Sequence, residues 1–340
     1  MPSIQSNFIT YPFEKWFQQK TPEEKAGVFL WPSLQGPTLL PEEEKLLEKY
    51  KPLCLTLFKR NLSSLKDAQD LIFQIKKIVP EIKIAIDEEG GRVSRLPLPF
   101  PATLSAEKIS SIEPLELALK TLEDQLLLQI SVAKLLGVEI FWAPVADLDI
   151  HPSNPGIKSR CYGQTYEKAL PFLLKIFRTL NKEGILSCAK HFPGHGNTNN
   201  DPHHMLATSL TKDFTEEWKP FRALFKEKIP FCMVGHMICP GLNSEIPATL
   251  DPHILSLLRN DLGFEGIISS DDLRMSGIRK DPHVPLGEIA WNVLQSGCDI
   301  LLSCHSIIEE EEIYSWLLNQ DLDILKEKAQ RIHSSMICKI

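Results

Sequence analysis

The segment 190–204 concentrates residue types that can do chemistry. It reads KHFPGHGNTNNDPHH and places four histidines and one aspartate within fifteen residues. Asp201 and His203 form a D-x-H pair, in which the carboxylate can orient the imidazole and favour its protonated form. A protonated imidazole of this kind is suited to general acid catalysis. The plainer interpretation is a polar loop that carries Gly, Asn and His for its turns alone.

A metal site is the alternative for the same segment. Its histidines and aspartate, His191, His195, Asp201, His203 and His204, are common ligand types. Their spacing matches no established ligand pattern, and Pro-Gly and Gly-Asn turns break the helix that an H-x-x-x-H pair would need. We therefore expect no metal ion and no other cofactor.

A pair of carboxylates ends another apolar run, which reads IISSDD over 267–272. An aspartate at this place could react with a substrate as a nucleophile, but acidic residues after a strand also commonly start the next helix. The period-two alternation of a strand puts Asp271 and Asp272 on opposite faces, so at most one is expected to face a site. Alternation does not say which.

These two segments lie within a regular alternation of predicted strands and helices. Eight short β-rich runs are followed by segments with apolar residues at helical spacing. The predicted strands are 28–31, 53–58, 82–86, 138–142, 185–189, 231–234, 266–269 and 299–302; the predicted helices include 65–78, 115–136, 166–182, 214–225, 253–262 and 286–295. Alternating strands and helices imply right-handed crossovers and a parallel sheet. Eight such units predict one (β/α)8 TIM-type barrel domain spanning 1–340, with a core of about 25–320. A doubly wound open sheet is the alternative.

The predicted strands run into residues capable of chemistry. Asp87, Asp147, Lys190 with His191, His236 and Asp271 each follow or end such a strand. In a barrel these strand ends share one rim, where the active site is built. The sequence therefore predicts that distant segments meet there.

Composition narrows the classes of partner. The 340 residues include 37 Lys and Arg against 44 Asp and Glu, a net charge of −7, so general nucleic-acid binding is not expected. The chain shows neither a signal-peptide pattern nor an apolar run of membrane-spanning length. Its eight cysteines are scattered without a C-x-x-C pair, which favours reduced thiols in the cytosol. We expect a cytoplasmic monomer that binds neither membranes nor nucleic acid.

Five motifs together carry a family resemblance. They are the run I-D-E-E-G-G-R-V-S-R-L at 86–96, K-H-F-P-G-H-G at 190–196, D-P-H at 201–203, P-A-T-L at 247–250 and L-G-F-E-G-I-I-S-S-D-D-L-R-M at 262–275. In this order they resemble the bacterial β-N-acetylhexosaminidases of glycoside hydrolase family 3. The resemblance implies a single barrel that removes terminal β-linked N-acetylglucosamine by a retaining double displacement.

The resemblance also implies residue roles. It makes Asp271 the nucleophile, which alternation left open, and makes His203 the general acid/base with Asp201 as its partner. The residues that match the family's sugar-binding positions are Asp87, Arg95, Arg160, Lys190 and His191. A histidine donor departs from the usual pair of carboxylates in retaining glycosidases.

Two positions differ from the family's loop, which usually reads G-D-T and D-S-H. Asn197 replaces the acidic residue and Pro202 replaces the small polar one. Pro202 fixes its own φ and biases Asp201 towards an extended conformation, which is expected to stiffen the loop. We still expect an active enzyme.

The resulting prediction is a cytosolic exo-β-N-acetylglucosaminidase. By resemblance, its substrate is an N-acetylglucosamine-containing muropeptide or oligosaccharide, above all N-acetylglucosaminyl-1,6-anhydro-N-acetylmuramyl peptides from cell-wall turnover. The alternatives are a β-glucosidase or β-xylosidase of the same family, a metal-dependent hydrolase that uses the histidine-rich loop, and a sugar-binding protein without catalysis.

Overall fold

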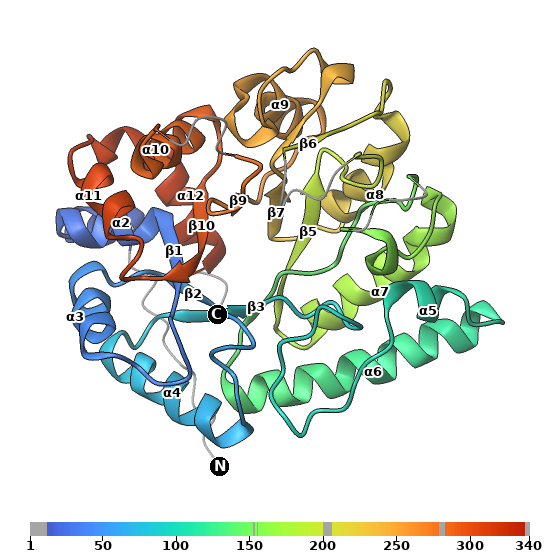
Figure 1. Ribbon diagram of the computed structural model, residues 1–340, viewed down its shortest axis with the longest axis horizontal. Coiled ribbons are helices and arrows are strands. Elements are labelled where there is room, and N and C mark those ends of the chain that lie inside the picture. Colours follow the sequence, from blue (N-terminus) through green and yellow to red (C-terminus); the bar gives the residue numbers. More distant parts are fainter. Residues whose placement is uncertain (1–11, 152–153, 155, 200–205, 279–282, 337–340) are drawn as a thin grey trace.

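The eight predicted strands form one parallel sheet that curves into a nearly closed barrel (Figure 1). The computed structural model describes residues 12–151, 154, 156–199, 206–278 and 283–336. The strand order is β1-β10-β9-β7-β5-β4-β3-β2. The strands are β1 (Leu30–Ser33), β2 (Cys54–Leu57), β3 (Lys83–Ile86), β4 (Ile140–Phe141), β5 (Leu186–Phe192), β7 (Phe231–Val234), β9 (Ile267–Asp272) and β10 (Ile300–Ser306). The outer strands β1 and β2 meet, and Leu53 N donates to Gly27 O just ahead of them (3.2 Å). The barrel is therefore confirmed over the open sheet.

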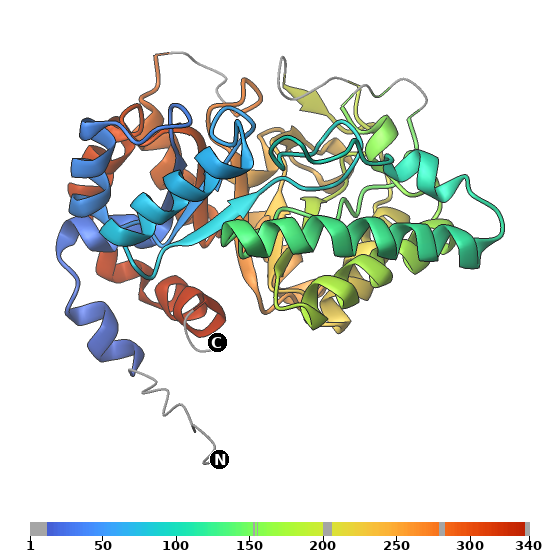
Figure 2. The same cartoon turned by 90° about the horizontal axis from the view of Figure 1, so that it is seen from below.

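Helices surround the strands on the outside (Figures 1 and 2). The α-helices are α1 (Phe13–Gln18), α2 (Pro22–Phe29), α3 (Pro41–Tyr50), α4 (Leu65–Ile78), α5 (Ala106–Ser110), α6 (Leu115–Leu136), α7 (Tyr166–Lys182), α8 (Thr215–Lys226), α9 (Pro252–Ser256), α10 (Leu286–Ser296), α11 (Glu311–Leu318) and α12 (Lys326–Met336). Short helical turns are η1 (Lys158–Arg160), η2 (Pro240–Leu242), η3 (Ala248–Leu250), η4 (Leu257–Asp261) and η5 (Leu322–Leu325). Within the described ranges, no helix has both the length and the apolar character needed to cross a bilayer.

Local chemistry sets where these helices begin and end. The Thr165 side chain accepts a hydrogen bond from Lys168 N and so caps the start of α7. Gly137 ends α6 in the left-handed region (φ 78°), which glycine enters without a side-chain clash. The bounds predicted for α4, α6 and α7 are confirmed.

Some predicted boundaries are wrong. The first strand begins at Leu30 rather than at residue 28, because Thr21 and Glu24 form a capping box that starts α2, and this helix continues through Phe29. The predicted helix 253–262 is α9 followed by the π-helical turn η4. The sequence also gave no sign of a separate two-stranded pair, β6 (Ala207–Thr208) with β8 (Met237–Ile238).

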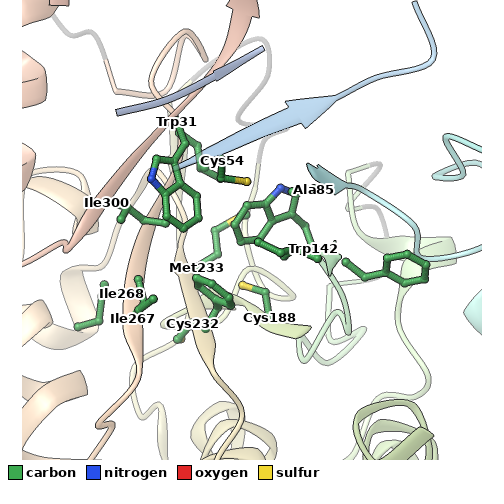
Figure 3. Close-up of a cluster of buried hydrophobic side chains, with 14 of the residues drawn as sticks. Trp31, Cys54, Ala85, Trp142, Cys188, Cys232, Met233, Ile267, Ile268 and Ile300 are labelled. Carbon is green, nitrogen blue, oxygen red and sulfur yellow. The ribbon is translucent and has the colours of Figure 1, made fainter. Parts of the chain in front are cut away.

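Buried hydrophobic side chains of the barrel strands, two tryptophans among them, pack together (Figure 3). Trp31, Trp142 and Phe231 are all buried, and their ring centroids lie 5.5 to 6.3 Å apart. Both indole N–H groups have partners, since Trp142 donates to Thr56 Oγ1 (3.1 Å) and Trp31 donates to Val28 O (3.0 Å). The interior is thus a packed core, as is usual for this fold, and Trp142 also borders the pocket above it.

Candidate active site

A pocket lies where the carboxyl ends of several barrel strands meet. It is lined by Thr56, Asp87, Glu89, Arg92, Val93, Arg95, Trp142, Arg160, Lys190, His191, Met233, Asp271, Leu302 and Cys304. All six predicted site residues that fall within the described ranges belong to this lining. The remaining two, Asp201 and His203, lie outside the described residues, as does Pro202.

The barrel topology brings these residues together from distant parts of the chain. Asp87 directly follows β3, Lys190 lies near the end of β5, and Asp271 lies near the end of β9. Arg95 comes from the loop after β3, and Arg160 from η1 in the segment after β4. Parallel strands of a barrel expose their carboxyl ends on one face, so the predicted meeting of these segments is confirmed.

One side of the pocket is a buried network of ion pairs. Lys190 Nζ lies 2.8 Å from Asp87 Oδ1 and 2.6 Å from Glu89 Oε1. Glu89 also accepts two hydrogen bonds of 2.8 Å from the Arg160 guanidinium. Burial alone would raise the pKa of Glu89, but Arg160 and Lys190 outweigh it and hold that pKa well below its usual range. Glu89, Arg160 and Lys190 are therefore charged at neutral pH, and the ion pairs hold their polar groups in fixed positions.

A second carboxylate orients His191. Asp147 Oδ2 lies 2.7 Å from His191 Nδ1 and also accepts from the His191 backbone N–H (3.1 Å), while Asp147 Oδ1 accepts from His195 N (2.6 Å). The Asp147 side chain is fully buried; burial raises its pKa, but His191 outweighs this and the net pKa is lowered. The other ring nitrogen, Nε2, lies 3.3 Å from Arg160 Nη2. Both ring nitrogens of His191 thus face protein groups, which disfavours His191 as a metal ligand.

A metal ion needs several ligating side chains around it. Among the described residues, no set of three or more His, Cys, Asp or Glu side chains is arranged to hold a metal ion.

Asn197, which differs from the family's loop motif, has a hydrogen-bond partner in the structure. Its Nδ2 donates to Thr211 Oγ1 (3.0 Å). Asn197 therefore ties the loop after β5 to the segment that follows β6.

A β-bulge lies beside Asp271. Ser269 pairs with Ile300 and Asp272 pairs with Leu302, so β9 advances three residues while β10 advances two. The extra residue interrupts the regular pairing of β9 with β10. Leu302 N donates instead to the Ser270 side chain (3.1 Å). Asp271 lines the pocket, and its Oδ1 accepts a hydrogen bond from Asp272 N (2.8 Å).

The neighbouring carboxylate serves the backbone. Asp272 Oδ1 accepts from Arg274 N (3.1 Å) and from Cys304 N (2.9 Å), which ties the end of β9 to β10. Burial raises the pKa of Asp272. The structure thus separates two adjacent aspartates that alternation alone could not assign: Asp271 borders the pocket, whereas Asp272 holds the strand end in place.

Sequence reasoning gave no role to Glu89 and Asp147, which fix Lys190, Arg160 and His191. Both residues follow predicted strands, and this position was the sequence signal that could have marked them as site residues. Their partners are 44 to 101 residues away in the sequence, and spacing alone does not reveal such pairs.

Comparison with known proteins extends these observations. Residues 23–336 match the family described as "Glycosyl hydrolase family 3 N terminal domain". The chain is 31% identical over 261 residues to a beta-hexosaminidase of Neisseria meningitidis serogroup B, covering 74% of this chain and 71% of that protein. It is 28% identical over 309 residues to a beta-hexosaminidase of Idiomarina loihiensis, covering 89% of this chain and 91% of that protein.

A solved structure shares the fold as well. NagZ from Neisseria gonorrhoeae, in complex with N-trifluoroacetyl-D-glucosamine, superposes with a TM-score of 0.78 at 26% identity, covering 92% of this chain and 93% of that chain. Fold, motifs and relatives therefore agree with the family expected from the sequence. The chain belongs to glycosyl hydrolase family 3 and is a glycoside hydrolase.

Proposed function

We propose that this enzyme is a retaining exo-β-N-acetylglucosaminidase. The observation that carries the proposal is one pocket at the barrel rim, lined by Asp271 together with the five residues expected to bind the sugar. The beta-hexosaminidase relatives and the NagZ complex with an N-acylated glucosamine support the choice of sugar.

The sugar is held by groups whose positions are already fixed. Lys190 is almost fully buried between Asp87 and Glu89, so its ammonium group has little freedom to move. Arg160 is held in the same way by Glu89, and His191 by Asp147. Such groups bind hydroxyl and amide groups without first paying the entropy cost of ordering themselves.

Asp271 is the nucleophile in this proposal. The hydrogen bond from Asp272 N to Asp271 Oδ1 fixes the orientation of the carboxylate at the pocket wall. Its attack on the anomeric carbon forms a covalent glycosyl-aspartate, which water then hydrolyses with retention of configuration.

His203, oriented by Asp201, donates the proton to the leaving oxygen and later deprotonates the attacking water. Glu88 and His236 could also do this by type, but both are engaged elsewhere. Glu88 is buried and accepts hydrogen bonds from Arg95 N (2.7 Å) and Gln129 Nε2 (2.6 Å). His236 has partners at both ring nitrogens and does not line the pocket.

The natural substrate belongs to the same proposal. We infer N-acetylglucosaminyl-1,6-anhydro-N-acetylmuramyl peptides, cleaved during cell-wall recycling in the cytoplasm by a single-domain monomer. The support is the motif resemblance together with the beta-hexosaminidase relatives.

A release assay tests the reaction. An aryl N-acetyl-β-glucosaminide and an aryl β-glucoside are compared, each with and without a chelator, and Asp271→Asn is the control for contaminating activity. We expect rapid release from the N-acetylglucosaminide, unchanged by chelation. Faster release from the glucoside would indicate a β-glucosidase. Loss on chelation, restored by a divalent ion, would indicate a metal-dependent hydrolase, and no release at all would favour a sugar-binding protein.

A further inference from the structure

His236 is a buried histidine just behind the pocket wall. It lies two residues after the end of β7 and has no solvent exposure. Its Nε2 lies 3.0 Å from the backbone carbonyl oxygen of Asp272, and its Nδ1 lies 2.8 Å from Thr249 Oγ1 in η3. The ring therefore joins η3, which carries the P-A-T-L motif, to the end of β9.

These partners define the protonation of the ring. A carbonyl oxygen only accepts hydrogen bonds, so Nε2 carries a hydrogen and donates it to Asp272. Burial lowers the pKa of His236, which favours the neutral ring. In a neutral ring the other nitrogen accepts, so the Thr249 hydroxyl donates to Nδ1. Thr249 thus selects the tautomer that can hold Asp272.

Asp272 in turn contacts Asp271. Its N–H donates to Asp271 Oδ1, and its carboxylate is held by Cys304 N and Arg274 N. The bulge in β9 removes the regular ladder at this place, so these contacts replace it. His236 contacts the Asp272 carbonyl oxygen from the β7 side, and Cys304 in β10 contacts the Asp272 carboxylate from the opposite side.

Arg274 also connects the end of β9 to the residues that follow β10. The Arg274 guanidinium reaches the buried Glu310 carboxylate (3.2 Å) and the Glu309 carbonyl oxygen. The end of β9 is therefore fixed on its β10 side even without His236. Loss of the His236 contact should shift Asp272 without unfolding the strand end.

We propose that His236, held by Thr249, is a positioning residue for the nucleophile Asp271. Through Asp272 it keeps the carboxylate aligned with the anomeric carbon, while it touches neither substrate nor reacting atoms. This inference rests on the proposed role of Asp271. Loss of the His236 contact should slow the attack by Asp271 and leave binding of the sugar unchanged, because the pocket residues that bind the sugar are held by separate contacts.

Matched variants separate the hydrogen bond from the bulk of the ring. His236→Gln retains an amide N–H close to the place of Nε2, whereas His236→Asn puts its amide near Nδ1 and does not reach Asp272. Thr249→Ser retains the hydroxyl, and Thr249→Val removes it with little change of shape. His253→Gln makes the same substitution at an exposed histidine in α9 and serves as the control.

The readouts are kcat and KM with an aryl N-acetyl-β-glucosaminide, the rate of covalent inactivation by a slow fluorinated substrate, and the melting temperature. We expect kcat and the inactivation rate to fall about tenfold or more in His236→Asn and by a smaller factor in Thr249→Val, with KM changed less than about twofold. His236→Gln, Thr249→Ser and His253→Gln should retain most of the rate.

Equal kcat in all folded variants would overturn the inference, as would equal losses in His236→Gln and His236→Asn. If His236→Asn does not fold, kcat is compared between Thr249→Val and Thr249→Ser. Equal values in these two variants would overturn the inference in the same way. Absence of turnover in the unsubstituted enzyme would instead contradict the proposed function.

Discussion

The two ends of the barrel both hold buried ion pairs, but in different surroundings. At the carboxyl end, Lys190 with Asp87 and Glu89 borders an open pocket. At the amino end, Asp299 just before β10 is fully buried and is bound by Arg259 of η4 and Arg331 of α12. Asp299 also accepts a hydrogen bond from Ile268 N (2.8 Å).

The difference shows what marks a functional site in this fold. Burial and charge pairing are common to both ends, so neither alone identifies function. At the amino end the protein's own groups surround Asp299, and the ion pairs join α12 and η4 to the barrel. At the carboxyl end the same kind of network leaves polar groups facing a space that a ligand can fill. The following predictions test this contrast, from the largest expected effect to the smallest.

Removal of the Asp271 carboxylate should give the largest loss. In Asp271→Asn, kcat/KM for an aryl N-acetyl-β-glucosaminide should fall by about 10⁴-fold or more, because no other group can form the covalent intermediate. Asp272→Asn is the matched control; its amide oxygen can still accept from Cys304 N, so measurable activity should remain. Equal losses in the two variants would contradict the separate roles of these neighbours.

His203→Ala should lose activity according to the leaving group. A sugar alkoxide needs a proton, so hydrolysis of natural disaccharides should fall roughly 10²- to 10⁴-fold, while release of an activated nitrophenol should suffer far less. Azide should speed deglycosylation in this variant and yield a glycosyl azide of retained configuration, because azide needs no general base. Asp201→Ala should show part of the same defect.

The test of this role is steady-state kinetics across a series of leaving groups. Equal losses for all of them, with no effect of azide when deglycosylation limits the rate, would mean that His203 only shapes its loop.

Asp299→Asn should affect stability rather than catalysis. The substitution leaves Arg259 and Arg331 without their buried counterion, so the free energy of unfolding should fall by about 2 kcal/mol, after allowance for the partial exposure of both arginines. Denaturant unfolding measures this loss, and kcat should remain unchanged in the folded protein. A large fall in kcat at unchanged stability would contradict the structural role of the amino end.

The sequence predicted the barrel because strand and helix periodicities are local properties. It also predicted which strand ends carry the site, since the fold places all of them on one face. It did not predict the bulge in β9, which depends on how Ser270 and Leu302 meet across two strands. The assignment of Asp271 over Asp272 came from family resemblance, because alternation alone does not say which of the two faces the site. Likewise, the roles of Glu89 and Asp147 arise from contacts between segments that are distant in the chain.

A smaller effect concerns acid stability. Burial lowers the pKa of His195 from 6.5 to about 4. Between these values the unfolded state binds a proton that the folded state does not, so stability should fall as pH drops from about 6.5 towards about 4, by about 1 kcal/mol at about pH 5.5. His195→Asn removes this titration, so its unfolding free energy should depend less on pH over this window. An unchanged pH dependence in denaturant unfolding would show that His195 does not contribute.

The central claim is that Asp271 alone forms the covalent intermediate, and peptide mapping tests it most directly. The enzyme is incubated with a slow fluorinated N-acetylglucosaminyl substrate, digested and analysed by mass spectrometry. We expect one labelled peptide, with the sugar attached to Asp271. A sugar on Asp272, or no labelled residue despite loss of activity, would contradict the claim.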